Sequence, residues 1–323
     1  MNNLLMHWTG RITGNENKIA FELFGNEVAW YGIIVTSAML LGLILACVRS
    51  KRYGLTTDDC LEVFLLLVPF SLLFGRLGHV FAVQPELLNV KSFSDFVQIF
   101  AVWKGGITIV TGLLGGVVSA LVWAKWRKKD FLLIADCALP TVLCAQALGR
   151  WGNFINQEIF GQAITNANAQ WFPLAVYIND PRAGVAEGFY QATFFYEAVL
   201  NLALMFAILF VLRRLRLKGA GTLLYFTAYP LVRFIMEFFR NENIYNKVNY
   251  TQISMGLVAL ACAGLFTFLV VRAVKKGEKI WFKKGIPEEL WLGANVDKAK
   301  PSKPKDNNEK INEEPINKEN PEE

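Results

Sequence analysis

The sequence has few of the residues on which metal and nucleotide chemistry depend. It contains two histidines in 323 residues, and neither an HExxH pair nor a Walker-type loop. Its five cysteines lack the spacing of a metal site or a disulfide framework. We therefore expect no metal and no cofactor, and interpret the thiols as small buried apolar groups, at Cys47, Cys60, Cys137, Cys144 and Cys262.

Charge is also scarce. Charged residues make up 19% of the chain, against roughly 25% in a soluble domain, and the mean hydropathy is +0.33. The charges cluster and leave apolar runs of about 20 residues, enough for a helix to cross the hydrocarbon layer. A soluble protein with a very large core would not be expected to show such regular alternation of long apolar runs and charged clusters. We predict an all-α polytopic membrane protein with seven transmembrane helices, near 28–48, 60–82, 105–124, 131–149, 192–212, 220–240 and 252–272.

Lysine and arginine clusters follow the first, third, fifth and seventh predicted spans. With an odd number of spans these clusters share one side, which the positive-inside rule identifies as the cytoplasm. The N-terminus is then outside and the C-terminus inside. The net charge of +6 reflects this topology and gives no reason to expect nucleic-acid binding. The clusters are Arg49, Lys51 and Arg52; Lys125, Arg127, Lys128 and Lys129; Arg213, Arg214, Arg216 and Lys218; and Arg272, Lys275 and Lys276.

The chain divides into a membrane domain and a polar tail. Residues 1–275 form the predicted transmembrane catalytic domain, with no sign of a cleaved signal peptide. A long outward connection covers 150–191. Residues 276–294 mix lysine with tryptophan, which suits either an interfacial segment or a plain solvated turn. From 295 to 323 apolar residues are almost missing, so we expect a disordered cytoplasmic tail.

Several ionisable residues lie inside predicted spans, where they are costly unless paired or hydrated. Arg233 and Glu237 are four residues apart and Glu237 and Arg240 three apart, so they share a helix face. A structural ion pair is one interpretation. The arginines outnumber nearby acids, however, which favours an anionic ligand such as a phospholipid headgroup. The full set is Arg76, His79, Asp136, Arg150, Glu158, Glu197, Arg233, Glu237 and Arg240.

The segment GRWGNFINQEIFG at 149–161 resembles the signature of the prolipoprotein diacylglyceryl transferase family. Further elements in the family's order extend the resemblance over most of the membrane domain. They are WYG at 30–32, GRLGHVF at 75–81, WKGGITIVTGLLGG at 103–116, TFFYE at 193–197 and RFIMEFFR at 233–240.

The resemblance implies an enzyme of the bacterial cytoplasmic membrane. The family transfers the diacylglyceryl group of phosphatidylglycerol to the lipobox cysteine in a prolipoprotein signal peptide, forming a thioether and releasing glycerol phosphate. It implies phosphate contacts for Arg150 and Arg233, which would also stabilise charge on the leaving group. Further substrate-binding or supporting residues are Asn153, Asn156, Gly161, Tyr31, Arg76, Tyr229, Glu237 and Arg240, with Glu158 and His79 as catalytic candidates.

Two positions depart from the family pattern and leave the proton acceptor open. Val110-Thr111 stands where many members have a histidine or tyrosine, and Gln191-Ala192 replaces a usual His-Pro. His79 is one substitute, although a lone histidine is more often a packing residue. Glu158 either accepts the proton or forms an ion pair that orders Arg150.

Three other functions are consistent with parts of the pattern. A non-catalytic lipid-binding or lipid-transporting bundle would use the same arginines. A solute transporter would be expected to show inverted repeats, and the two halves show none that is obvious. A catalytically inactive relative would explain Val110 and Gln191.

The third predicted span is rich in glycine. Such residues let neighbouring helices approach closely or leave space for a ligand. They are Gly105, Gly106, Gly112, Gly115 and Gly116.

Overall fold

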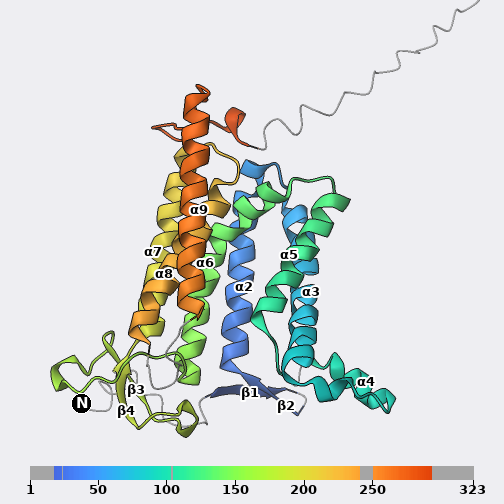
Figure 1. The fold of residues 1–323 in the computed structure, drawn as a ribbon, viewed down its shortest axis with the longest axis vertical. Helices are drawn as coiled ribbons and strands as arrows, with labels where there is room; N and C mark the ends of the chain where they lie inside the picture. Colours follow the sequence, from blue (N-terminus) through green and yellow to red (C-terminus); the bar gives the residue numbers. More distant parts are fainter. Residues whose placement is uncertain (1–17, 24, 103–104, 241–249, 293–323) are drawn as a thin grey trace, which may run out of the picture.

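The computed structural model describes residues 18–23, 25–102, 105–240 and 250–292 and shows a bundle of long helices (Figure 1). Six helices are long and apolar enough to cross a membrane. They are α2 (Trp30–Arg49), α3 (Thr57–Val83), α5 (Ile109–Trp126), α6 (Phe131–Asn156), α7 (Thr193–Arg214) and α9 (Tyr250–Lys275). The described chain is thus mostly helical, as expected for a polytopic membrane protein.

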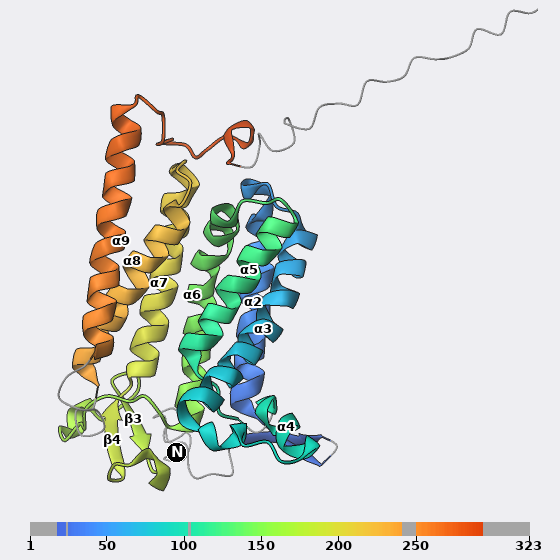
Figure 2. The ribbon, with the colours of Figure 1, turned by 45° about the vertical axis from the view of Figure 1, so that its right-hand side comes forward.

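A further helix, α8 (Ala220–Met236), occupies the predicted 220–240 span and packs against α6, α7 and α9. It has 17 residues, which makes it shorter than the six candidate spans, and it continues as a single 3-10 turn at Glu237–Phe239. Pairing of α2 with α6 and of α3 with α5 completes the bundle (Figure 2). Helix α6 contacts α2, α7 and α8, so polar residues on it lie inside the protein.

The mostly helical architecture agrees with the predicted all-α polytopic class, and the structure adds two short hairpins that were not predicted. Two antiparallel hairpins, β1–β2 and β3–β4, lie at the same end of the bundle as the short helix α4 (Figure 1). We call this the hairpin end. The elements are β1 (Ile19–Leu23), β2 (Asn26–Ala29), α4 (Phe93–Ile99), β3 (Ala175–Ile178) and β4 (Gly188–Gln191).

Two predicted span boundaries are corrected. Helix α5 begins at Ile109 instead of 105, because Gly105 and Gly106 adopt φ angles of +78° and +70° that a right-handed helix excludes. Helix α6 continues to Asn156 instead of ending at 149, so the long connection begins at Gln157. The polar residues that we assigned to the start of a connection therefore lie on the last two turns of a helix.

Glycines in α5 allow close packing against α3. A Cβ atom added at Gly115 would lie 2.6 Å from Cβ of Phe74 and 2.8 Å from the carbonyl oxygen of Phe70. Real Cβ contacts are not that short, so only glycine allows this approach. Of the two interpretations of the glycine-rich span, helix packing applies here.

Asp136 on α6 joins two helices at the opposite end of the bundle. Its side chain is 1% exposed and accepts hydrogen bonds from the backbone N–H of Gly219 (2.6 Å) and from the N–H and hydroxyl of Thr222 (2.8 and 2.7 Å). These donors lie at the N-cap and in the first turn of α8, where backbone N–H groups have no partner within the helix. Asp136 thus supplies the N-terminal cap of α8 from another helix.

The chain after α9 folds back on the α7–α8 connection. The N–H of Arg216 donates to the Ile280 carbonyl (2.7 Å), and that of Phe282 to the Arg214 carbonyl (3.0 Å). The predicted interfacial segment is thereby ordered up to residue 292, and the predicted disordered tail at 295–323 lies outside the described residues.

The cysteines differ in burial. Cys137 and Cys144 are buried, whereas Cys47, Cys60 and Cys262 are half-buried.

Candidate active site

The last turns of α6 place the GRWGNFIN residues at the hairpin end. The helix ends at Asn156, and its C-cap residue Gln157 adopts a left-handed conformation with a φ of +52° and is 2% exposed. Its side-chain oxygen accepts the N–H groups of Asn179 and Asp180 at 2.8 and 3.0 Å, and its amide donates to the Asn179 side chain at 2.9 Å. One glutamine therefore fastens the end of α6 to the loop after β3.

Glu197 on α7 holds two of the predicted phosphate ligands. Its Oε1 accepts from Nη1 of Arg233 on α8 at 2.9 Å, and its Oε2 forms an ion pair with Nη2 of Arg150 on α6. The Glu197 side chain is 1% exposed, and those of Arg150 and Arg233 are 13% and 9% exposed. A single buried carboxylate thus brings together two arginines that are 83 positions apart in the sequence.

The charged group continues along α8 into its 3-10 extension. Oε2 of Glu237 lies 3.4 Å from Nη2 of Arg233 and 3.4 Å from Nε of Arg240. Three arginines therefore alternate with two glutamates. Among these five described residues the arginines exceed the glutamates by one. We call Arg150, Glu197, Arg233, Glu237 and Arg240 the arginine–glutamate cluster.

Glu158 lies beside the arginine–glutamate cluster and contacts it through an amide. Oε1 of Glu158 accepts from Nδ2 of Asn153 (2.9 Å) and of Asn156 (3.2 Å), while Oδ1 of Asn153 accepts from Nη1 of Arg150 (3.3 Å). The ion-pair interpretation is corrected on this point, since Arg150 pairs with Glu197 and reaches Glu158 only through Asn153. Glu158 is exposed, whereas Asn153 is buried.

Tight packing surrounds these side chains. A Cβ atom added at Gly152 would lie 2.7 Å from the ring of Tyr31, so this tyrosine of α2 rests directly on α6. One added at Gly161 would lie 2.6 Å from the Phe239 carbonyl, and Gly161 also pairs with Arg240 in an isolated antiparallel bridge. The structure therefore places Tyr31 and Gly161 against elements that carry residues of the arginine–glutamate cluster.

Tyr229 lies one helical turn before Arg233 on α8. Its ring stacks on that of Tyr225, with centroids 5.8 Å apart and planes at 9°. The Tyr225 hydroxyl in turn accepts from the side chain of Gln146 on α6 at 2.9 Å. These contacts hold α8 against α6 on the N-terminal side of Arg233.

Arg76 and His79 lie on α3, and their described contacts are with the 98–106 segment instead of the cluster. The Arg76 guanidinium donates to the carbonyls of Gln98 (3.0 Å), Ile99 (3.2 Å), Gly105 (2.8 Å) and Gly106 (3.3 Å). His79 packs on Gly106, where an added Cβ would lie 2.6 Å from its ring. These contacts give Arg76 a role in folding the connection that precedes α5.

The two departures from the family pattern have different surroundings. Val110 is 67% exposed in the first turn of α5. Gln191 ends β4, and its backbone accepts the N–H of Gly161 (3.0 Å) and donates to the carbonyl of Gln162 (3.0 Å). Gln191 therefore supports the segment that carries Gly161.

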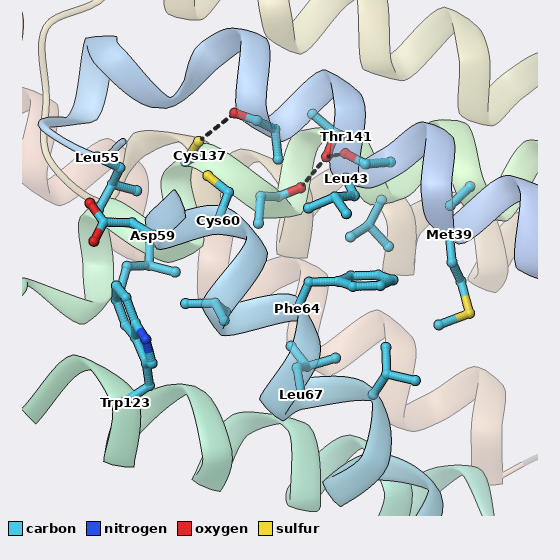
Figure 3. Close-up of a pocket in the computed structure, with 18 residues that line it drawn as sticks. Met39, Leu43, Leu55, Asp59, Cys60, Phe64, Leu67, Trp123, Cys137 and Thr141 are labelled. Atoms are coloured by element: carbon cyan, nitrogen blue, oxygen red, sulfur yellow. Dashed lines mark hydrogen bonds between the residues drawn. The ribbon is translucent and has the colours of Figure 1, made fainter. Parts of the chain in front are cut away.

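An apolar cavity of about 230 Å³ lies between α2, α3, α5 and α6 (Figure 3). Its walls are mostly aliphatic and aromatic, with residues such as Leu43, Phe64, Leu67 and Trp123. On α6 its lining includes Thr141, Val142 and Ala145, on the helix that carries Arg150 less than two turns further on. The cavity is chemically suited to hydrocarbon.

The prolipoprotein diacylglyceryl transferase family model matches residues 18–271. This protein belongs to that family. Its relatives include proteins named phosphatidylglycerol–prolipoprotein diacylglyceryl transferase, two of which come from Oceanobacillus iheyensis and Clostridium perfringens. The one from Oceanobacillus iheyensis is 34% identical over 233 residues, covering 71% of this chain and 79% of its own length. The one from Clostridium perfringens, numbered 1, is 32% identical over 278 residues, covering 82% and 99%.

Two further polar residues, both on α7, are almost completely buried in the bundle. Glu197 was noted in the sequence as an intramembrane acid but not as a site residue, although the TFFYE element contains it. Asn201, one turn further along α7, is 0% exposed, and among the described residues neither polar atom of its side chain has a hydrogen-bond partner. A buried amide without partners costs roughly 1–3 kcal/mol, so Asn201 lowers the stability of the bundle.

Proposed function

We propose that this protein transfers the diacylglyceryl group of phosphatidylglycerol to the lipobox cysteine thiol of prolipoproteins. Membership of the prolipoprotein diacylglyceryl transferase family supports the reaction, and the names of its relatives specify the lipid donor. The observation that carries the assignment to a site is the pair of arginines held by Glu197 at the end of an apolar bundle.

In the proposed reaction the cysteine sulfur attacks a carbon of the lipid glycerol. A carbon–sulfur bond forms, the carbon–oxygen bond to phosphate breaks, and glycerol phosphate leaves with the bonding electrons. Arg150 and Arg233 keep N–H donors beyond those that they give to Glu197, because a guanidinium has five. Those donors bind the phosphate and stabilise its growing negative charge in a site largely shielded from water.

The thiol must lose its proton, because thiolate is the reactive form. We assign the proton to Glu158, whose carboxylate is exposed beside Asn153 and therefore accessible to a peptide. Asn153 and Asn156 orient it through Oε1. We assign supporting roles at this surface to Tyr31, Gly161, Tyr229, Glu237 and Arg240, and their contacts with α6, α8 and each other support that assignment.

We also propose how the protein lies in the membrane. Helix α8 completes a seventh crossing, since roughly 17 residues is the lower limit for a span. The basic clusters then favour an orientation with the hairpin end and the N-terminus outside and the C-terminus in the cytoplasm of a bacterium. Phosphatidylglycerol enters sideways from the bilayer, and one acyl chain occupies the apolar cavity between α2, α3, α5 and α6.

The decisive experiment incubates purified protein with phosphatidylglycerol and a lipobox peptide. We expect a mass increase on cysteine equal to the diacylglyceryl group, with release of glycerol phosphate. A folded protein that binds the lipid without transferring it would establish the lipid-binding alternative instead.

Conservative substitutions test the phosphate contacts. Arg150→Lys and Arg233→Lys keep the charge but remove the two-pronged donor geometry, so we expect each to reduce transfer by about 10²-fold or more. Arg272→Lys, at the exposed end of α9, is the matched control. Full activity in both site variants would rule out the arginines as the phosphate site.

A further inference from the structure

A cleft with basic walls lies at the end of the bundle opposite the hairpin end. It has a volume of about 430 Å³ and is lined by Arg52, Arg213, Lys284 and Trp291, with residues 285–287 between them. It shares no residue with the arginine–glutamate cluster. Because three separate segments contribute one cation each, the cleft is a product of the fold and not of a single basic run.

Backbone contacts build the cleft. The N–H of Ile286 donates to the Arg213 carbonyl (3.1 Å) and that of Phe282 to the Arg214 carbonyl (3.0 Å). At Gly285 the chain turns with a φ of +100°, a conformation that L residues rarely adopt, and passes over the Arg213 side chain. The segment after α9 is thereby held as one wall of the cleft.

The cleft carries positive charge that the described residues do not neutralise. Arg52 donates to the carbonyl of Leu212, and within the described ranges neither it nor Arg213 nor Lys284 forms an ion pair. The acids Glu288 and Glu289 follow closely in the chain but are exposed and do not line the cleft. Three like charges around one space repel each other, so binding an anion is favourable.

The surroundings of the cleft indicate that this anion belongs to a lipid. Arg52 follows directly on α2 and Arg213 lies in the last turn of α7, so the cleft opens where two spanning helices end. Trp281 and Leu290, in the segment that supplies one wall of the cleft, are 49% and 38% exposed. Exposed tryptophan next to lysine is typical of the membrane interface, where basic pockets bind anionic headgroups.

We propose that this cleft binds the phosphate of an anionic phospholipid and so docks residues 276–292 on the membrane surface. This second lipid site is separate from the transfer site and does not depend on the reaction proposed above. The bound lipid would serve as an anchor and not as a substrate.

Native mass spectrometry of the full-length protein in detergent tests the proposal by counting retained phosphatidylglycerol molecules. We expect the triple variant Arg52→Gln, Arg213→Gln, Lys284→Gln to bind one molecule roughly a hundredfold more weakly, given the usual contribution of each basic residue near a lipid surface. Lys284→Glu alone changes only an exposed side chain, so this variant is expected to fold normally. We expect it also to bind that one phosphatidylglycerol molecule more weakly. Phosphatidylcholine, which has no net charge, is expected to bind weakly throughout.

A matched triple variant controls for general surface charge. Lys125→Gln, Lys128→Gln and Arg272→Gln remove three exposed cations from the same end of the bundle outside the cleft, and are expected to leave lipid retention unchanged. Equal loss in both triple variants, or no loss in the cleft variants, would overturn the proposal. Displacement of the lipid by millimolar inorganic phosphate would identify a free-anion site instead. Transfer activity, measured in parallel, is expected to survive in all these variants.

Discussion

Arg233 and Glu197 form the central ion pair of the bundle, with Nη1 of the arginine 2.9 Å from Oε1 of the glutamate. The carboxylate is 1% exposed and also pairs with Arg150. Removing one member of a buried pair leaves the other charge uncompensated in a medium of low dielectric constant. Glu197 therefore has two functions, since it allows both arginines to be buried and fixes the distance between them.

Glu197→Gln is expected to lower the free energy of unfolding by about 3 kcal/mol, because two guanidinium groups lose their shared counter-charge. Transfer is expected to fall as well, since Arg150 and Arg233 are no longer held together. Thermal unfolding in detergent and the peptide transfer rate measure the two effects. Glu187→Gln, on the exposed β3–β4 loop, serves as the control. Unchanged stability would show that the cluster does not need this carboxylate.

Glu158→Gln separates proton transfer from orientation. The amide oxygen can still accept from Asn153 and Asn156, but the group can no longer take a proton at neutral pH. We expect transfer to fall by about 10²-fold or more, the usual contribution of a general base. Activity should recover as pH rises toward the thiol pKa of about 8.5, because thiolate then forms without assistance. A pH profile parallel to that of the unchanged protein would restrict Glu158 to an orienting role.

His79→Tyr is expected to leave transfer at the level of the unchanged protein, because the described contact of His79 is with Gly106 and not with the arginine–glutamate cluster. Gly106→Ala is expected to be far more damaging. Its φ of +70° disfavours alanine, and the new Cβ would lie 2.6 Å from His79 and 2.9 Å from Nη1 of Arg76. Comparing transfer rates of the two variants tests the assignment; abolished activity in His79→Tyr alone would make His79 catalytic.

Asp136→Asn tests the cap that α6 provides to α8. The amide nitrogen would face a buried N–H donor, so we expect a loss of about 1–3 kcal/mol in the free energy of unfolding. Transfer at low temperature should be retained, since Asp136 lies at the opposite end of the bundle from the arginine–glutamate cluster. Asp130→Asn makes the same change at the exposed cap of α6, where the amide oxygen can still accept the N–H of Leu132, and is expected to cost less. Equal costs for the two would contradict the role of burial.

Asn201→Leu separates stability from function. Replacing a buried amide that has no described partner with an apolar group of similar size is expected to raise the melting temperature. Transfer is expected to fall, because Asn201 lies one turn from Glu197, which holds Arg150 and Arg233. Ala207→Leu, on the exposed face of α7, is the control. A variant that is both more stable and fully active would show Asn201 to be dispensable.

Much of this architecture was accessible from sequence because membrane spans are local. Length and hydropathy alone place a helix near each of the seven predicted spans, since every backbone polar group in lipid must be satisfied within its own helix. The two wrong boundaries have local causes too. Left-handed glycines delay α5, and α6 remains helical through a polar stretch because its last turns lie inside the protein.

The arrangement of the site was harder to predict. Helical spacing correctly paired Arg233 with Glu237 and Glu237 with Arg240, since those contacts lie on one stretch of chain. It could not show that Arg150 pairs with Glu197 instead of Glu158, because that choice depends on how α6, α7 and α8 meet. Nor could it show that Arg76 is occupied by carbonyls 22 to 30 residues away.

The bonds of Gln157 make the hairpin end vulnerable from outside. Three hydrogen bonds from this one buried side chain join the helix that carries Arg150 to the loop after β3. In the proposed orientation that loop faces away from the cytoplasm. A ligand that displaced the glutamine would loosen the end of α6 without crossing the membrane, which makes this junction a target for inhibitors that never enter the cell.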